Sequence, residues 1–199
     1  MEASPPRRDG DATRGRLLRA ALELYTTDGF LRTTTPALAE RAGVAEGTIY
    51  RHFSSKEHLL NAAHREAHRW GIDVLNVLDA DRVRHAPERL AVLGHRIVDM
   101  AAQDPPLIRM LLSAVHEPFL DEPSRAMQRE FQAGLVQLVA MGKSEGRVRS
   151  GPAELWAQVW LAIVGLAAER VAAGEWAPDS GPAGLTLEAA WDAIASRSP

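Results

Sequence analysis

The chain has 199 residues, of which 46% are hydrophobic and 25% charged, so it can bury a sizeable core and has the composition of a soluble protein. Cysteine is absent, which excludes disulfides, thiol nucleophiles and thiolate metal sites. A net charge of −3 argues against a uniformly basic nucleic-acid-binding protein, although residues 7–19 contain five arginines against two aspartates.

The N-terminal segment is polar and rich in proline, and it lacks the apolar run of a secretory signal. The longest apolar stretch, residues 155–168, is interrupted by Gln158 and is shorter than the about 20 residues that a membrane span needs. We therefore expect a cytoplasmic protein without a membrane partner.

Apolar residues recur at helical spacing along the whole chain, and no stretch alternates in the manner of a β-strand. The predicted fold class is all-α: an N-terminal three-helix head followed by a C-terminal helical bundle. The predicted helices span about residues 12–28, 36–42, 46–52, 55–78, 87–103, 107–115, 123–143, 152–173 and 186–197. The predicted divisions are a disordered basic arm (1–11), the head (12–54) and a ligand-binding and dimerisation domain (55–199).

Short polar residues mark several helix ends. Thr35, ahead of a proline, is predicted to cap the second helix, and Gly43 to end it. Ser54 and Glu57 have the spacing of a capping box at the start of the fourth helix. Thr186 is predicted to cap the last helix.

Two short helices joined at Gly43 form a candidate helix-turn-helix. Ala39 is small where the two axes must approach, and Gly43 accepts the positive φ that the turn requires. Leu38, Val44 and Ile49 are predicted to anchor the pair to the core. Such a unit presents the N-terminal side of its second helix to the DNA major groove.

Hydroxyl, cationic and acceptor side chains gather on the predicted outer side of this unit. Hydroxyls and lysine suit phosphates, an arginine fork matches guanine, and a carboxylate can accept from cytosine N4. The expected DNA-binding residues are Thr33, Thr34, Thr35, Glu46, Gly47, Thr48, Tyr50, Arg51, His52 and Lys56. An αα-hairpin inside a bundle, with Tyr50 and Phe53 as core aromatics, fits the same spacing.

The stretch TTTPALAERAGVAEGTIYRHFSSKEHLL, residues 33–60, resembles the DNA-binding region of TetR-type transcriptional repressors. The matching positions are Ala39, Gly43-Val44, Gly47-Thr48, Tyr50, His52-Phe53 and Lys56-Glu57-Leu59. Ala45 departs from the family, which often has a capping Ser or Thr there. The resemblance implies an all-α homodimer that binds a palindromic operator through a helix-turn-helix head. It also implies repression of a promoter that a small molecule relieves.

The predicted 152–173 helix is apolar around most of its circumference, so it needs cover on two sides. A second copy of the same helix supplies such cover at a two-fold interface, whereas a central helix in a monomer accounts for the same pattern. Candidate interface residues are Trp156, Val159, Ile163, Val164, Ala167, Trp191 and Ile194.

Large apolar residues of the C-terminal part are candidates both for ordinary core and for an effector cavity. The candidate lining residues are Trp70, Met100, Leu107, Met110, Leu111, His116, Phe119, Phe131, Leu135 and Trp160. We expect a small apolar or amphipathic effector; His116 is a candidate polar group inside the pocket, and a surface loop fits this residue equally well. Gly71 is predicted to mark a bend or a tight contact in the fourth helix, whose displacement by the effector would move the head.

Catalytic motifs are missing from the sequence: it has no G-x-S-x-G, H-E-x-x-H, P-loop or dinucleotide fingerprint. His64 and His68 have the spacing of a metal pair on one helix face, but no third ligand accompanies them, and a solvated helix face is the favoured interpretation. We predict no enzyme, no cofactor and no metal site. The alternative function is a helical-bundle interaction protein, or a small-molecule binder, that does not bind an operator.

Overall fold

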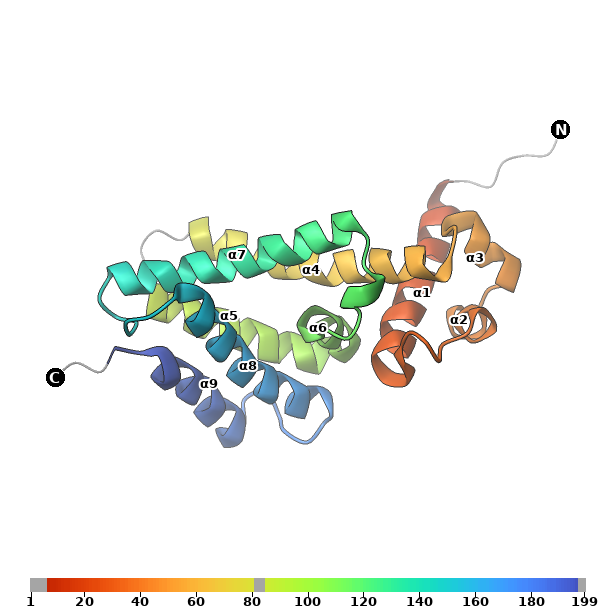
Figure 1. The fold of residues 1–199 in the computed structure, drawn as a ribbon. Coiled ribbons are helices and arrows are strands. Elements are labelled where there is room, and N and C mark those ends of the chain that lie inside the picture. Colours follow the sequence, from red (N-terminus) through yellow and green to blue (C-terminus); the bar gives the residue numbers. More distant parts are fainter. Residues whose placement is uncertain (1–6, 81–84, 197–199) are drawn as a thin grey trace. The chain divides into compact units, whose positions relative to one another are not determined.

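The computed structural model describes residues 7–80 and 85–196, and within them it confirms the all-α prediction (Figure 1). The only strand-like feature in these residues is an isolated antiparallel bridge between Val148 and Ala195. The elements are α1 (Arg7–Leu24), the π-helical turn η1 (Tyr25–Gly29), α2 (Thr35–Ala42), α3 (Glu46–His52), α4 (Lys56–Ala80), α5 (Ala86–Gln103), α6 (Pro105–Leu112), the 3-10 turn η2 (Glu117–Phe119), α7 (Glu122–Ser144), α8 (Ala153–Ala172) and α9 (Gly181–Ile194).

Two helices begin five residues earlier than predicted. The first, α1, already begins at Arg7, so Arg7–Asp11 is helical instead of belonging to a disordered arm, and residues 1–6 lie outside the described residues. Gly10 weakens a helix by only about 1 kcal/mol and does not stop it. The last, α9, begins at Gly181, since the hydroxyl of Ser180 accepts a backbone hydrogen bond there. Thr186, the predicted cap, lies inside this helix.

Two other predicted caps are displaced by one residue. Thr34, not Thr35, caps α2 by accepting a backbone hydrogen bond at 3.3 Å. Ser55, not Ser54, accepts from the backbone N–H of His58 at 3.1 Å at the start of α4, so the predicted capping box is wrong. Adjacent hydroxyl residues have the same capping chemistry, and only the backbone conformation decides which one caps.

The described residues form two compact units. The first contains residues 7–66 and 113–125, and the second contains 67–80, 85–112 and 126–196. In the first unit the predicted anchors Leu38 and Ile49 are fully buried, together with Leu17, Leu22 and Phe53. The functional division into a head (12–54) and a ligand-binding domain (55–199) stays a prediction.

Residues 113–125 are attached to the first half of α4 by a polar network. The side chain of Asn61 donates to the carbonyl of Phe119 at 3.1 Å and accepts from the backbone N–H of Asp121 at 2.8 Å. Arg65 donates to Asp121 and Ser124. Partial burial opposes the charged form of Asp121, but hydrogen bonds from Ser124 and Arg65 outweigh it and lower its pKa.

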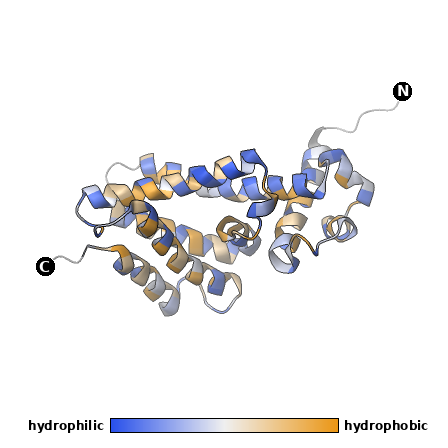
Figure 2. Cartoon of the chain, in the orientation of Figure 1, coloured by the Kyte–Doolittle hydropathy of each residue, from blue (hydrophilic) through white to orange (hydrophobic). Residues whose placement is uncertain are grey.

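In the second unit α8 packs against α5 and α9. Its buried side is formed by Ala157, Trp160, Val164, Ala167, Ala168 and Val171. Figure 2 shows that most of α8 is hydrophobic. By length and composition alone, this 20-residue helix is long and apolar enough to cross a membrane. Within the second unit, one side of this helix is buried against α5 and α9, and the opposite side is not.

The fourth helix, α4, continues through Gly71 without a break. A Cβ atom at this position would lie 2.8 Å from the ring of Phe131 and 3.3 Å from Leu111. Of the two predicted roles of Gly71, close packing is therefore confirmed.

Candidate nucleic-acid interface and small-molecule clefts

The turn between α2 and α3 is built on Gly43, which has φ 64°. The backbone N–H of Gly43 donates to Glu40 at 3.1 Å, and that of Val44 donates to Ala39 at 3.0 Å. These bonds satisfy the last carbonyls of α2 and turn the chain sharply. The predicted role of Gly43 is confirmed, and Ala39 is buried as the close approach requires.

The start of α3 lacks a side-chain cap because Ala45 occupies the capping position. A different contact holds this end: the hydroxyl of Thr35 donates to Oε1 of Glu46 at 2.9 Å. The bond links the N-terminal ends of α2 and α3, and it fixes a carboxylate near the positive end of the α3 dipole.

Several predicted DNA-binding side chains lie exposed along α3. Tyr50 is 55% exposed, and Gly47 and Arg51 are also exposed, while Thr48 and His52 are half-buried. Within the described part of the chain, neither the Tyr50 hydroxyl nor the Arg51 guanidinium has a hydrogen-bond or ion-pair partner. We call the set Thr34, Thr35, Glu46, Gly47, Tyr50 and Arg51 the head face.

Thr33 and Lys56 do not point outward as predicted. Thr33 is buried, and its hydroxyl donates to the carbonyl of Gly29 at 2.9 Å. The ammonium of Lys56 donates to the carbonyls of Phe30 at 2.8 Å and Thr33 at 3.0 Å, and it lies 4.3 Å from the centre of the Phe30 ring. Unpaired carbonyls between η1 and α2 are the physical reason, since a long flexible cation satisfies two of them at once.

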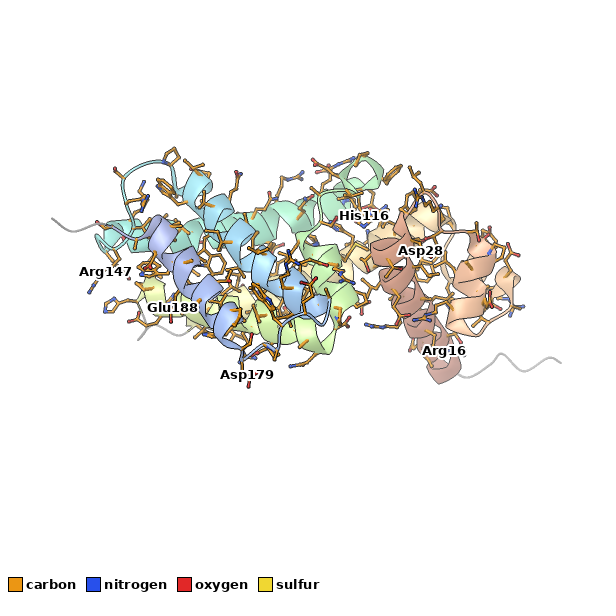
Figure 3. The ribbon with its side chains drawn as sticks, turned by 90° about the horizontal axis from the view of Figure 1, so that it is seen from below. Arg16, Asp28, His116, Arg147, Asp179 and Glu188 are labelled. Carbon is orange, nitrogen blue, oxygen red and sulfur yellow. The ribbon has the colours of Figure 1, made fainter. Side chains whose placement is uncertain are left out.

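Arginines of α1 also have intramolecular partners. Arg19 pairs with Glu23 at 2.8 Å, and Arg41 of α2 pairs with the same carboxylate. Partial burial opposes the charge of Glu23, but hydrogen bonds from Arg41 and Arg19 hold its pKa below the ordinary value. Arg16, labelled in Figure 3, reaches the carbonyl of Gly43 at 3.4 Å. These residues line an open cleft of about 310 Å³.

Most candidate effector-lining residues are core. Leu107, Met110, Leu111, Phe131 and Leu135 are each at most 7% exposed, and Trp70, Met100 and Phe119 are half-buried. Trp160 lines a cleft of about 580 Å³ between α5 and α9, together with Leu187 and Trp191. The other nine candidates do not line this cleft, and their role toward an effector stays a prediction.

His116 is buried, with 3% of its surface exposed, and Nδ1 has no hydrogen-bond partner among the described residues. Burial lowers the pKa of His116 below its ordinary value, because a charged imidazole loses its hydration there. Burial therefore favours the neutral imidazole, and whether His116 contacts an effector stays a prediction.

The assignment of three candidate residues to the dimer interface is wrong. Val164, Ala167 and Ile194 are fully buried within the chain itself, so they have no surface left for a partner. The indole N–H of Trp156 donates to the carbonyl of Ser150 at 3.0 Å. Val159, Ile163 and Trp191 are half-buried and keep some surface.

The free apolar side of α8 lies opposite its buried side. Leu155 is 47% exposed and Leu166 50% exposed, and Val159 and Ala162 lie between them at helical spacing. On α9, Leu185 is 66% exposed. We call Leu155, Val159, Ala162 and Leu166 of α8 the exposed leucine stripe; of these, only Val159 was among the candidate interface residues.

The metal-pair alternative receives no support. His64 and His68 are both buried, at 1% and 2% exposed, so they do not form a solvated helix face either. The ring of His68 packs edge-on against Phe131 with a centroid distance of 6.1 Å. Among the residues described, no group of three potential ligands is close enough to hold a metal ion.

Comparison with known proteins places this geometry in a family. Residues 17–63 match the family described as bacterial regulatory proteins, tetR family. The chain is 30% identical over 139 residues to the nucleoid occlusion factor SlmA of Marinobacter nauticus, covering 68% of each chain. It is 50% identical over 50 residues to the repressor KstR of Rhodococcus jostii, a match covering 25% of this chain and 24% of that protein.

A solved structure of a TetR family transcription regulator from Marinobacter aquaeolei VT8 superposes with a TM-score of 0.80 at 24% identity, covering 96% of this chain and 100% of that one. The similarity therefore extends through the helices that follow the head. The predicted resemblance is confirmed, and the chain belongs to the tetR family of bacterial regulatory proteins, which are helix-turn-helix regulators of transcription and not enzymes.

Proposed function

We propose that the protein is a homodimeric repressor that binds a palindromic operator through the head face and leaves it when a small apolar or amphipathic effector binds. The observation that carries this proposal is the pair Tyr50 and Arg51, both exposed on α3 without intramolecular partners. Donors left free on an exposed helix face suit phosphates and base edges. The KstR repressor shares half of the 50 aligned residues, which supports repression.

The exposed leucine stripe supports the homodimer. Leu155 and Leu166 each leave about half of their surface in water. A second copy that apposes the same stripe removes this apolar surface from water at an isologous interface. Two heads then bind successive major grooves when they lie about 34–36 Å apart.

Release by an effector is supported by the attachment of residues 113–125. Within the first unit, the Phe119 ring lies 4.7 Å from the Phe30 ring, and the carbonyl of Phe30 accepts from Lys56. An effector that contacts His116 and shifts this segment therefore disturbs the contacts that hold the start of α2. A neutral imidazole with an unsatisfied nitrogen suits an amphipathic ligand.

Operator binding is tested by fluorescence anisotropy with the DNA that flanks the protein's own gene, divided into overlapping duplexes. We expect one duplex with a two-fold repeat to bind far more tightly than the rest. About 8 phosphate contacts per dimer give a slope near −7 for log K against log salt. Arg51→Ala should weaken this binding, whereas Arg69→Ala, an equal loss of charge at an exposed position of α4, should not. Equal binding of every duplex would contradict the proposal.

The dimer is tested separately by analytical ultracentrifugation. Leu166→Glu places a charge in the exposed leucine stripe and should yield monomers. Val77→Glu is the matched control, because Val77 is an exposed apolar residue of α4 outside the stripe. Dimers of normal affinity in Leu166→Glu would place the interface elsewhere.

A further inference from the structure

The cleft between α5 and α9 has the size of a small-molecule site. Its volume is about 580 Å³, within the roughly 300–1,000 Å³ of typical ligand pockets. Leu90, Leu187, Trp160 and Trp191 supply apolar lining. At Gly94 a Cβ atom would lie 3.1 Å from Leu187 and 3.5 Å from Trp160, so the glycine allows the three helices to meet at the cleft wall.

Three carboxylates line the same cleft. Glu88 comes from α5, and Glu188 and Asp192 come from α9; Figure 3 labels Glu188 on that helix. Among residues 7–80 and 85–196, no side chain forms an ion pair or hydrogen bond with these carboxylates. Arg149 approaches Asp192 only at its main-chain carbonyl, at 3.3 Å. His95 is the one basic side chain in the lining, so negative charge predominates.

Two indoles complete the site. Trp160 is 2% exposed and lines the cleft, yet no described residue accepts a hydrogen bond from its indole N–H. Buried tryptophans ordinarily place this N–H against an acceptor. Trp191 is half-buried and lines the cleft from α9. Indole faces attract organic cations more strongly than other aromatic side chains do.

We propose that this cleft binds a hydrophobic organic cation, an amine with an aromatic or alkyl body. The ammonium pairs with Glu88 and Glu188, the body contacts Trp191 and Leu187, and a polar atom of the ligand accepts from Trp160. No residue of the exposed leucine stripe lines the cleft, whereas Trp191 lines it and is also a candidate interface residue. The site does not depend on the head face and is tested without DNA.

The test is isothermal titration calorimetry of the full chain with three probes of one skeleton: 4-phenylbutylamine, 4-phenylbutanol and 4-phenylbutyrate. A charge-assisted contact is worth about 1.5–3 kcal/mol, so we expect the amine to bind about tenfold or more tightly than the alcohol, and the acid not to bind. Glu88→Gln and Glu188→Gln should each raise the Kd of the amine about tenfold. Asp99→Asn is the matched control, at an exposed position of α5 outside the cleft.

Tryptophan fluorescence locates the bound probe independently. We expect the amine to quench emission in the wild type, and the quenching to fall in Trp191→Phe. Equal affinity for amine and alcohol would overturn the cation selectivity. Unchanged amine binding in both glutamate variants would overturn the location, whatever the outcome of the operator experiments.

Discussion

The hydroxyl of Thr35 and the carboxylate of Glu46 meet at 2.9 Å, where the first residue of α2 faces the first residue of α3. This bond lies on the head face, and it orients an acceptor-only side chain toward the groove that the proposed function assigns to α3. A carboxylate there accepts from cytosine N4 and repels phosphate. Under the proposed function, we therefore predict that Glu46 selects sequence at a cost in general affinity.

Glu46→Gln should bind nonspecific DNA more tightly, because a negative charge facing the duplex is removed. The preference for cytosine at one operator position should fall, by about 1–3 kcal/mol of discrimination. Anisotropy titrations with single-base-pair variants of the operator measure both effects. Glu40→Gln, an exposed acid on α2 outside the head face, serves as control. If Glu46→Gln bound the operator variants in the same order of affinity as the wild type, Glu46 would take no part in base recognition.

Tyr50→Phe and Arg51→Ala should weaken DNA binding in different ways. The tyrosine hydroxyl is a neutral donor, so its loss should cost about 1 kcal/mol on every sequence alike. The arginine fork matches guanine O6 and N7, so its loss should relax the choice at one base pair by about 1–3 kcal/mol. Competition with a library of operator variants separates the two patterns, and identical profiles would contradict the assignment.

Lys56→Met should destabilise the fold by about 1–3 kcal/mol, because two carbonyls lose a charged donor. The slope of log K against log salt should stay unchanged, since the ammonium is bound to Phe30 and Thr33. Urea unfolding and salt titrations measure the two quantities. Arg51→Met should show the reverse: normal stability and a shallower slope. A shallower slope for Lys56→Met would restore the predicted phosphate contact.

Gly71→Ala should destabilise the protein although alanine favours helix by about 1 kcal/mol. The added Cβ meets the buried ring of Phe131 at 2.8 Å, and overpacking of this kind costs about 1–3 kcal/mol. Gly15→Ala in α1 is the control: no atom lies within 4 Å of its new Cβ, so it should stabilise. Urea unfolding measures the free energy of unfolding of both variants. A more stable Gly71→Ala would show that the Phe131 ring moves aside at little energetic cost.

His116 should make stability depend on pH below about 6.5. Burial lowers its pKa in the folded chain from the ordinary value of 6.5, so the unfolded chain binds more protons as the pH decreases through this range. Stability is therefore complete above the unfolded pKa and declines toward the folded one. The drop in Tm between about pH 7.5 and about pH 5.5 should be smaller in His116→Gln. An equal drop would mean that His116 is hydrated.

The helix-turn-helix was predictable because each of its requirements leaves a local mark. Gly43 supplies the positive φ, and Leu38 and Ile49 repeat at helical spacing. Lys56 was not predictable in the same way, since an ammonium donates equally well to a phosphate or to a carbonyl. Only the folded segment between η1 and α2 brings two free carbonyls within its reach.

The interface candidates on α8 show a second limit. A helix that is apolar all round has no polar face to indicate its orientation, so Val164 and Ala167 were assigned to the wrong side. Packing against α5 and α9 decides which residues remain free, and that information is non-local. The acidic cleft was missed for a related reason, because Glu88 and Glu188 lie 100 positions apart.

The hydrogen bonds from Asn61 and Arg65 to residues 113–125 affect how chimaeras of this regulator with related proteins should be designed. The piece that folds with α1, α2 and α3 is discontinuous in the gene, since it includes a segment encoded more than forty codons after the first half of α4. A chimaera that exchanges only the N-terminal third would take Phe30 and Asn61 from one parent. The residues of 113–125 that they contact would come from the other parent. Transplanting operator specificity therefore requires both coding segments, or a graft restricted to the outward side chains of α3.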